Sequence, residues 1–151
     1  MREALDDLLR AARAVVPADA AALWLWDVAA GRLILAAHQG MPAEGLIQEI
    51  DPAESTAERQ ALTAGWVRTE LPGDPLPGSL RVRLGAAERP LGLLHLRVAS
   101  AAALDDAAIG RAQALATVGG RLLEAQQKAA DLEQLEAAQT QFIHVATHEL
   151  R

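Results

Sequence analysis

The chain has 151 residues with a formal net charge of −6, and 51% of them are apolar although only 3% are aromatic. This length supports one hydrophobic core with an extension, and a net negative charge without a basic cluster excludes nucleic acid as a partner. The absence of cysteine excludes disulfides and thiol chemistry, and the absence of a signal peptide or a ~20-residue apolar span predicts a cytoplasmic protein with no membrane partner.

The N-terminal quarter of the chain predicts a helix followed by a β-hairpin. Apolar residues recur every three or four positions over residues 2–16, which is the pattern of an amphipathic helix. Residues 20–26 form an apolar strand, and residues 32–38 form the returning strand after a turn over residues 27–31. Gly31 is the expected positive-φ residue of that turn, because glycine adopts this conformation without steric penalty.

The middle of the chain predicts two short helices and then three strands. Both helices lie within residues 43–64, where Asp51 and Pro52 separate them. The three strands follow at residues 65–70, 79–84 and 91–99. In the second of these strands, apolar residues alternate with Arg81 and Arg83, so one face is expected to be buried and the other polar.

A single long helix is predicted from Leu104 to the C-terminus, with Asp105 and Asp106 at its start. At about 1.5 Å per residue it would span about 70 Å, which exceeds the length of a helix in an ordinary globular domain. Apolar or small residues follow the 3-4-3-4 spacing of a coiled coil: Leu115, Val118, Leu122, Ala125, Ala129 and Leu132. The phase shifts near Leu132, as a stammer would produce. The pattern predicts a homodimer formed through the N-terminal helix and this long helix.

Gly119 and Gly120 interrupt the long helix, at about 1 kcal/mol each relative to alanine. One interpretation is that Ala112, Ala116 and Gly119 form a small-residue face where two helices of a dimer approach closely, or where the helix bends. The other is that a packed helix simply tolerates the two glycines.

The last ten residues hold the most specific motif of the chain. Phe142 and the residues after it lead to Thr147, His148 and Glu149, and the chain ends at Arg151. A neutral imidazole is a good nucleophile near neutral pH, and a neighbouring carboxylate can accept its ring proton while the other nitrogen attacks a phosphoryl group. His148 and Glu149 are therefore candidate catalytic residues, although both are also ordinary side chains for an exposed helix end.

A metal site is the competing chemical interpretation of this segment. His144 and His148 are four residues apart on one helix face, so both imidazoles could chelate a metal ion. The zinc-protease motif requires glutamate directly after the first histidine, and Val145 occupies that position. Glu149 is the only further candidate ligand nearby, so no metal site is predicted.

The spacing from Phe142 to Arg151 resembles the phosphoacceptor box of sensor histidine kinases. The resemblance implies that His148 accepts a phosphoryl group and that Glu149 is the general base. It also implies ATP and Mg²⁺ as cofactors of the intact kinase and the receiver domain of a response regulator as its partner. The family's second hairpin helix and ATP-binding domain are not present, so this chain is expected to be inactive alone.

The rest of the chain resembles a GAF domain, which is a PAS-like sensor fold, over about residues 3–125. The resemblance rests on the segments 19–27, 38–40, 79–84 and 90–96. It implies an α+β fold, an antiparallel sheet flanked by helices, with a ligand pocket on one face and a long C-terminal coiled-coil helix. The expected domains are a GAF sensor domain over residues 1–118 and a linker helix over residues 119–151 that ends in the phosphoacceptor box.

Bulky or polar residues on the apolar strands are the candidate ligand-binding groups of the implied pocket: Trp24, Trp26, His38, Trp66, His95 and Arg97. Each could instead be a core residue or an ordinary strand residue. The chain lacks the cysteines of bilin-binding and methionine-sulfoxide-reducing GAF domains and the asparagine of cyclic-nucleotide-binding ones. The ligand is therefore unknown and no cofactor is predicted in this chain, with haem ligation by His38 or His95 left as an open alternative.

The leading functional hypothesis is the sensory and dimerisation portion of a cytoplasmic two-component sensor histidine kinase, relaying a signal from the GAF domain to His148. The alternative is a ligand-free GAF dimerisation spacer that sets the register of the helices. A pocket filled by Trp24, Trp26 and leucine side chains would favour that alternative.

Overall fold

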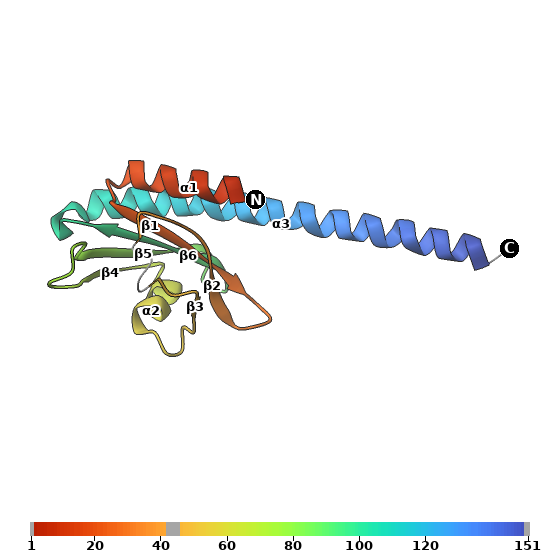
Figure 1. The fold of residues 1–151 in the computed structure, drawn as a ribbon, viewed down its shortest axis with the longest axis horizontal. Helices are drawn as coiled ribbons and strands as arrows, with labels where there is room; N and C mark the ends of the chain where they lie inside the picture. The colour runs from red at the N-terminus through yellow and green to blue at the C-terminus, as the bar shows by residue number, and fades with distance from the viewer. Residues whose placement is uncertain (1, 42–45, 150–151) are drawn as a thin grey trace.

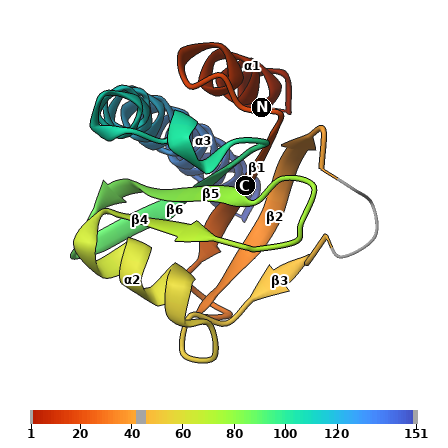
Figure 2. The same ribbon diagram turned by 90° about the vertical axis from the view of Figure 1, so that its left-hand side faces the viewer.

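An antiparallel sheet lies between helices on both faces of the molecule (Figure 1). The computed structural model describes residues 2–41 and 46–149. Helix α1 (Arg2–Val15) and the first half of α3 (Asp106–Glu149) lie side by side on one face, and α2 (Thr56–Ala64) covers the other (Figure 2). The second half of α3 extends beyond the sheet and ends far from it (Figure 1). This is the expected α+β architecture with a long C-terminal helix.

The sheet has six strands in the order β3-β2-β1-β6-β5-β4, and every neighbouring pair is antiparallel. The strands are β1 (Ala20–Asp27), β2 (Arg32–Gln39), β3 (Glu49–Ile50), β4 (Trp66–Glu70), β5 (Gly78–Ala86) and β6 (Arg89–Val98). A short 3₁₀ helix (Ala101–Ala103) leads from β6 into α3. The predicted hairpin is confirmed, and Gly31 has the expected positive φ of 65°.

The prediction of two helices within residues 43–64 is wrong for its first half. Within the described part of this region only Thr56–Ala64 is helical, and Glu49–Ile50 pairs with β2 as strand β3. Residues 43–45 of the predicted first helix lie outside the described residues. The pairing of Ile50 with Leu33 buries both side chains, so tertiary contact decides the conformation of this short segment.

Alternate residues of each strand face the two sides of the sheet, and each side has its own core. The side under α1 and α3 holds the larger cluster, with Leu9 of α1 against Leu23, Leu80 and Leu94 of the strands. The other side buries a smaller cluster against α2 and β3: Ala22, Trp24, Leu33, Ile50, Ala61 and Leu93. Burying a leucine contributes about 1.5–3 kcal/mol, so the leucine-rich larger cluster is the main source of stability.

The first half of α3 packs closely because its inner face is made of small residues. The Oδ1 of Asp105 accepts a hydrogen bond from the N–H of Ala108 at 2.8 Å and so caps the helix start. A β-carbon on Gly119 would lie 3.0 Å from Leu8 Cδ1, and one on Gly120 would lie 3.1 Å from the backbone nitrogen of Gly85. The two glycines therefore let α3 lie directly against α1 and β5.

This packing corrects the dimer interpretation of the small-residue face. Ala112 and Ala116 are 1% and 2% exposed, and they belong to the core between α3 and the sheet of the same chain. Gly119 and Gly120 are also buried there, and α3 runs through them without interruption. The small residues serve contact within the chain, so they are not available to a second copy.

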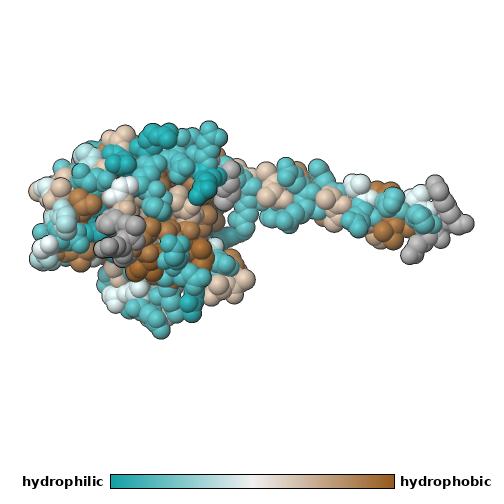
Figure 3. All heavy atoms as spheres, viewed as in Figure 1, coloured by the Kyte–Doolittle hydropathy of each residue, from teal (hydrophilic) through white to brown (hydrophobic). Residues whose placement is uncertain are grey.

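The second half of α3 makes few contacts with the rest of the chain. Leu123 is the last buried residue among the side chains of α3 that the structure describes, and those beyond Gln126 are almost all exposed. Large apolar side chains are among them, and Phe142 is 73% exposed. Figure 3 shows this protruding segment as a mainly hydrophilic rod with apolar patches towards its end. Among the described residues, no helix combines the length and apolar content needed to cross a membrane.

Candidate functional site

A buried polar cluster lies on the face of the sheet that α2 covers. Ser79 and His95 are 0% and 9% exposed, and the Oγ of Ser79 is 2.7 Å from the Nε2 of His95. Arg81, in the register position opposite His95, donates to the Oγ of Ser79 at 3.0 Å and to the Oγ1 of Thr69 at 3.1 Å. Its Nε donates to Glu58 of α2 at 3.0 Å, so the cluster ties the helix to the sheet.

These contacts fix the protonation of the cluster. Burial is the first cause that holds the pKa of His95 well below its usual range, and the positive charges of Arg81 and Arg97 act in the same direction. His95 is therefore neutral at pH 7. Because the Oγ of Ser79 accepts a hydrogen from Arg81, its own hydroxyl hydrogen is free to point at Nε2 of the neutral ring.

A serine bonded to a neutral histidine is also the arrangement of a nucleophile with its base. Here the serine is fully buried, and Arg81 occupies a lone pair of the hydroxyl that would have to attack. The buried position and the hydrogen bond from Arg81 leave no access for a substrate to this hydroxyl. The geometry is that of a structural clamp between β5, β6 and α2.

Arg97 makes a second polar link at the neighbouring edge of this face. Its guanidinium is 2.8 Å from the Oδ1 of Asp74 and donates two hydrogen bonds to the carbonyl oxygen of Leu76, at 2.6 Å and 3.1 Å. The backbone N–H of Leu76 and the charge of Arg97 lower the pKa of Asp74. Arg97 therefore holds the loop between β4 and β5 against the sheet.

The six candidate pocket residues do not line one pocket. Trp24 is buried beside His95, with ring centroids 5.9 Å apart, and its indole N–H donates to the carbonyl oxygen of Ile47 at 3.1 Å. Arg97 lies on the same face, and Trp26 is half-buried at the end of β1. The remaining two candidates, His38 and Trp66, are not part of this group of residues.

His38 is exposed near the end of β2. Trp66 faces the opposite side of the sheet, where it pairs in register with Val82 and packs against the core under α1 and α3. The structure thus brings together Trp24, His95 and Arg97 and packs Trp26 against the cluster that holds Trp24. His38 is in register with Ala22 but exposed, and Trp66 lies on the other face.

Sequence reasoning missed most of the polar cluster, namely Glu58, Thr69, Ser79 and Arg81, and it also missed Asp74, the partner of Arg97. The alternation in β5 correctly separates the arginines from the leucines, but it does not say what packs against the arginines. The usable signal was the position of His95 on the adjacent strand, because pairing of the two strands places it among the arginines.

The predicted phosphoacceptor lies on the exposed end of α3. His148 is exposed, and its ring centroid is 6.4 Å from that of His144, one turn earlier. The backbone of Glu149 continues the helix, whereas its side chain, Leu150 and Arg151 lie outside the described residues. In the part of the chain that the structure describes, no group of three or more His, Cys, Asp or Glu residues could hold a metal ion.

Known structures share this architecture although no protein-family model and no curated protein matches the sequence. A GAF domain/HD domain protein from Geobacter sulfurreducens superimposes with a TM-score of 0.72 over 83% of this chain and 93% of that one, at 17% identity. The chain has the GAF fold.

Two further GAF-fold structures come from candidate sensor histidine kinases. The GAF domain of one from Pseudomonas syringae pv. tomato is 28% identical, with a TM-score of 0.64, over 85% of this chain and 77% of that one. The other is a domain of a candidate two-component sensor histidine kinase from Sinorhizobium meliloti 1021. It is 17% identical, with a TM-score of 0.66, over 89% of this chain and 97% of that one. Sensor kinases are thus one setting in which this fold occurs.

Proposed function

We propose that this chain is the sensory and dimerisation portion of a two-component sensor histidine kinase, in which α3 relays a signal from the GAF fold to His148. The observation that carries the proposal is the continuity of α3. One 44-residue helix packs on the sheet through Gly119, Gly120 and Leu123 and bears His148 at its exposed end. A displacement of the helix on the sheet is therefore transmitted along a single element.

Exposed apolar side chains on the protruding half of α3 support dimerisation. The large ones with 45% to 73% exposure are Leu132, Leu135, Phe142, Ile143 and Val145. A lone helix leaves these side chains in water, so they contribute no hydrophobic stabilisation. A parallel pair of helices would bury Leu132, Leu135 and Phe142 along one seam. In this arrangement α1 and α3 of the two protomers form the contact.

The chemistry assigned to the C-terminal box is phosphoryl transfer. A ring nitrogen of His148 attacks the γ-phosphorus of ATP, ADP leaves, and Glu149 takes up the proton of the other ring nitrogen. The phosphoryl group then passes to an aspartate of a response-regulator receiver domain. In this proposal ATP and Mg²⁺ are held by the ATP-binding domain of the intact kinase.

The test is phosphorylation of this chain fused after Arg151 to the second hairpin helix and ATP-binding domain of a characterised histidine kinase. The fusion is expected to take up acid-labile phosphate from radiolabelled ATP, and H148Q is expected to abolish the label. The matched control is H144Q, which removes the other imidazole from the same exposed helix face. Label that survives H148Q, or that H144Q abolishes equally, would contradict the assignment of His148.

The second candidate function is a ligand-free spacer, and the packing under α2 favours it. Trp24 is 5% exposed with its indole N–H already bonded, and Arg81 and Arg97 are both paired with carboxylates. Native mass spectrometry of the purified chain separates the two candidates. A dimer with additional non-covalent mass supports the sensor, and a bare dimer supports the spacer.

A further inference from the structure

The sheet opens into a fork at one end, between its two central strands. Strands β1 and β6 are paired only as far as Leu25 and Gly92. Beyond that point β1 continues with β2 to the pair Asp27–Arg32, and β6 continues with β5 to the pair Ala86–Arg89. The two hairpins therefore diverge, and α3 passes over the opening with Leu123 facing it.

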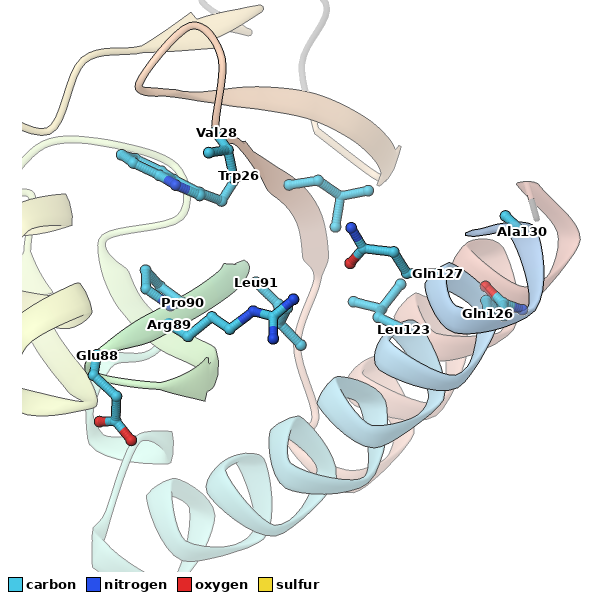
Figure 4. Close-up of a pocket in the computed structure, with 11 residues that line it drawn as sticks. Trp26, Val28, Glu88, Arg89, Pro90, Leu91, Leu123, Gln126, Gln127 and Ala130 are labelled. Carbon is cyan, nitrogen blue, oxygen red and sulfur yellow. The ribbon is translucent and has the colours of Figure 1, made fainter. Parts of the chain in front are cut away.

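A cavity of about 750 Å³ occupies this fork (Figure 4). Its walls are mainly apolar and come from three elements: Leu25 and Trp26 of β1, Pro90 and Leu91 of β6, and Leu123 and Ala130 of α3. Cavities of about 300–1,000 Å³ with mostly apolar walls and few polar groups are typical of small-molecule sites. The cavity is separate from the polar cluster under α2.

One positive charge points into this apolar space. Figure 4 shows the guanidinium of Arg89 directed between the hairpins towards α3, whereas the carboxylate of Glu88 is directed away. Among the residues that the structure describes, the Arg89 side chain has neither a hydrogen bond nor an ion pair, in contrast to Arg81 and Arg97 on the same sheet. Its planar set of N–H donors matches a carboxylate and is available to one.

We propose that this cavity binds a small amphipathic carboxylate, a molecule with one carboxylate and an unbranched apolar chain. The carboxylate pairs with the Arg89 guanidinium, and the chain lies against Leu25, Leu91 and Leu123. A single inward cation and apolar walls fit one negative charge with an apolar body better than they fit a polyphosphate or a sugar. The amide of Gln127, which also faces the cavity, can donate to the second carboxylate oxygen.

The bound molecule touches both hairpins and α3 at the place where the helix leaves the sheet. It would bridge α3 and the two hairpins, whose strands β1 and β6 are no longer paired at this end. The site lies within this chain and is independent of His148, so its test does not depend on phosphoryl transfer.

The test is isothermal titration calorimetry of the chain with sodium decanoate below its micelle concentration. One site per chain is expected, and R89Q should weaken binding about tenfold or more because it removes a charge-assisted hydrogen bond. The matched control is R121Q, which makes the same charge change on an exposed position of α3 outside the cavity. Decanol, which has the same chain without the charge, should bind the wild-type chain about tenfold more weakly.

The indole N–H signals of the three tryptophans locate the site in a ¹H–¹⁵N spectrum. Decanoate should shift the signal of Trp26, which lines the cavity, and leave that of Trp66 in place. Circular dichroism confirms that R89Q is folded, as expected for an exposed side chain. No binding to the wild-type chain, equal binding to R89Q, equal weakening by R121Q, or a shift of Trp66 instead of Trp26 would each overturn the proposal.

Discussion

The two halves of α3 have similar length and helical content but opposite relations to the rest of the chain. From Ala108 to Leu123 the helix presents mostly alanine and glycine to the sheet, with Ile109 and Leu123 as the large residues among those buried. From Gln127 to His148 it presents leucine, isoleucine and phenylalanine to solvent. Most of the buried contacts of the packed half are thus made by small residues, whereas the large apolar residues of the protruding half have no partner among the described residues.

The difference shows how the size of the side chains on a helix face sets the distance at which another element can pack against that face. Gly120 allows backbone contact with Gly85 because neither residue has a side chain at the crossing. Large side chains on the protruding half would span the wider spacing of two paired helices, where each apolar knob fits between four residues of the opposite helix. Two variants test this division, and a third tests the polar cluster beneath α2; they follow from the largest expected effect to the smallest.

Replacing Gly120 with leucine should disrupt the packed half of α3. Its β-carbon alone would lie 3.1 Å from the backbone nitrogen of Gly85, so the helix would have to move away from β5. We expect the free energy of unfolding to fall by about 3 kcal/mol or more, the upper end for overpacked cores. Urea denaturation followed by circular dichroism measures it.

The matched control for this variant is Gly110 in the same helix. A β-carbon on Gly110 meets no atom within 4 Å, so G110L should gain about 0.8 kcal/mol from helix propensity alone. If G120L were as stable as G110L, close contact between α3 and β5 would not be what the glycine serves.

Replacing Leu135 with glutamate should affect the protruding half without affecting the fold. Leu135 is 55% exposed within the chain, so its loss removes no core contact. A charge in the dimer seam should weaken association about tenfold or more, equivalent to about 1.4 kcal/mol. Sedimentation equilibrium measures the dissociation constant, with A137E as the control off the seam. An unchanged dimer in L135E would place the interface elsewhere.

The smallest effect concerns pH and the clamp beneath α2. As pH falls through about 6.5 the unfolded chain protonates His95, whereas the folded chain resists because burial lowers the pKa of His95. The unfolded state then binds more protons, so the free energy of unfolding should decrease by on the order of 1 kcal/mol between about pH 7.5 and pH 5.5.

The variant H95Q should remove that part of the pH dependence, and H38Q, at an exposed histidine, should leave it intact. Urea titrations at the two pH values measure the difference. A wild-type pH dependence that persists unchanged in H95Q would assign it to other groups.

Much of the fold follows from local patterns in the sequence. The 3.6-residue period identifies α1, the strict alternation around Val82 identifies β5, and Gly31 marks the hairpin turn. These elements were predictable because each leaves a local signal in the sequence, either a regular spacing of the apolar residues that face the core or a glycine at the turn. Strand β3 was not, since its two residues have no period and take their conformation from β2.

The candidate site was less predictable because sequence alternation distinguishes two faces without saying what covers each. Arg81 was expected on a polar face, and it lies there, but α2 supplies Glu58 and encloses it. The role of Gly119 and Gly120 was equally hidden, because it depends on Leu8 and Gly85, residues distant in sequence. Contacts of this kind become visible only when the chain is folded.

The contact between Gly120 and Gly85 also has a mechanical consequence. At about 1.5 Å per residue, His148 lies about 40 Å along the helix from Gly120, so a tilt of about 5° there would swing the imidazole by about 4 Å. The buried part of α3, from Asp106 to Gly120, is about 21 Å long, so the same tilt would move its start by about 2 Å. The exposed part of the helix is twice as long and therefore about doubles any movement of the buried part, with the contact between Gly120 and the backbone of β5 as the pivot.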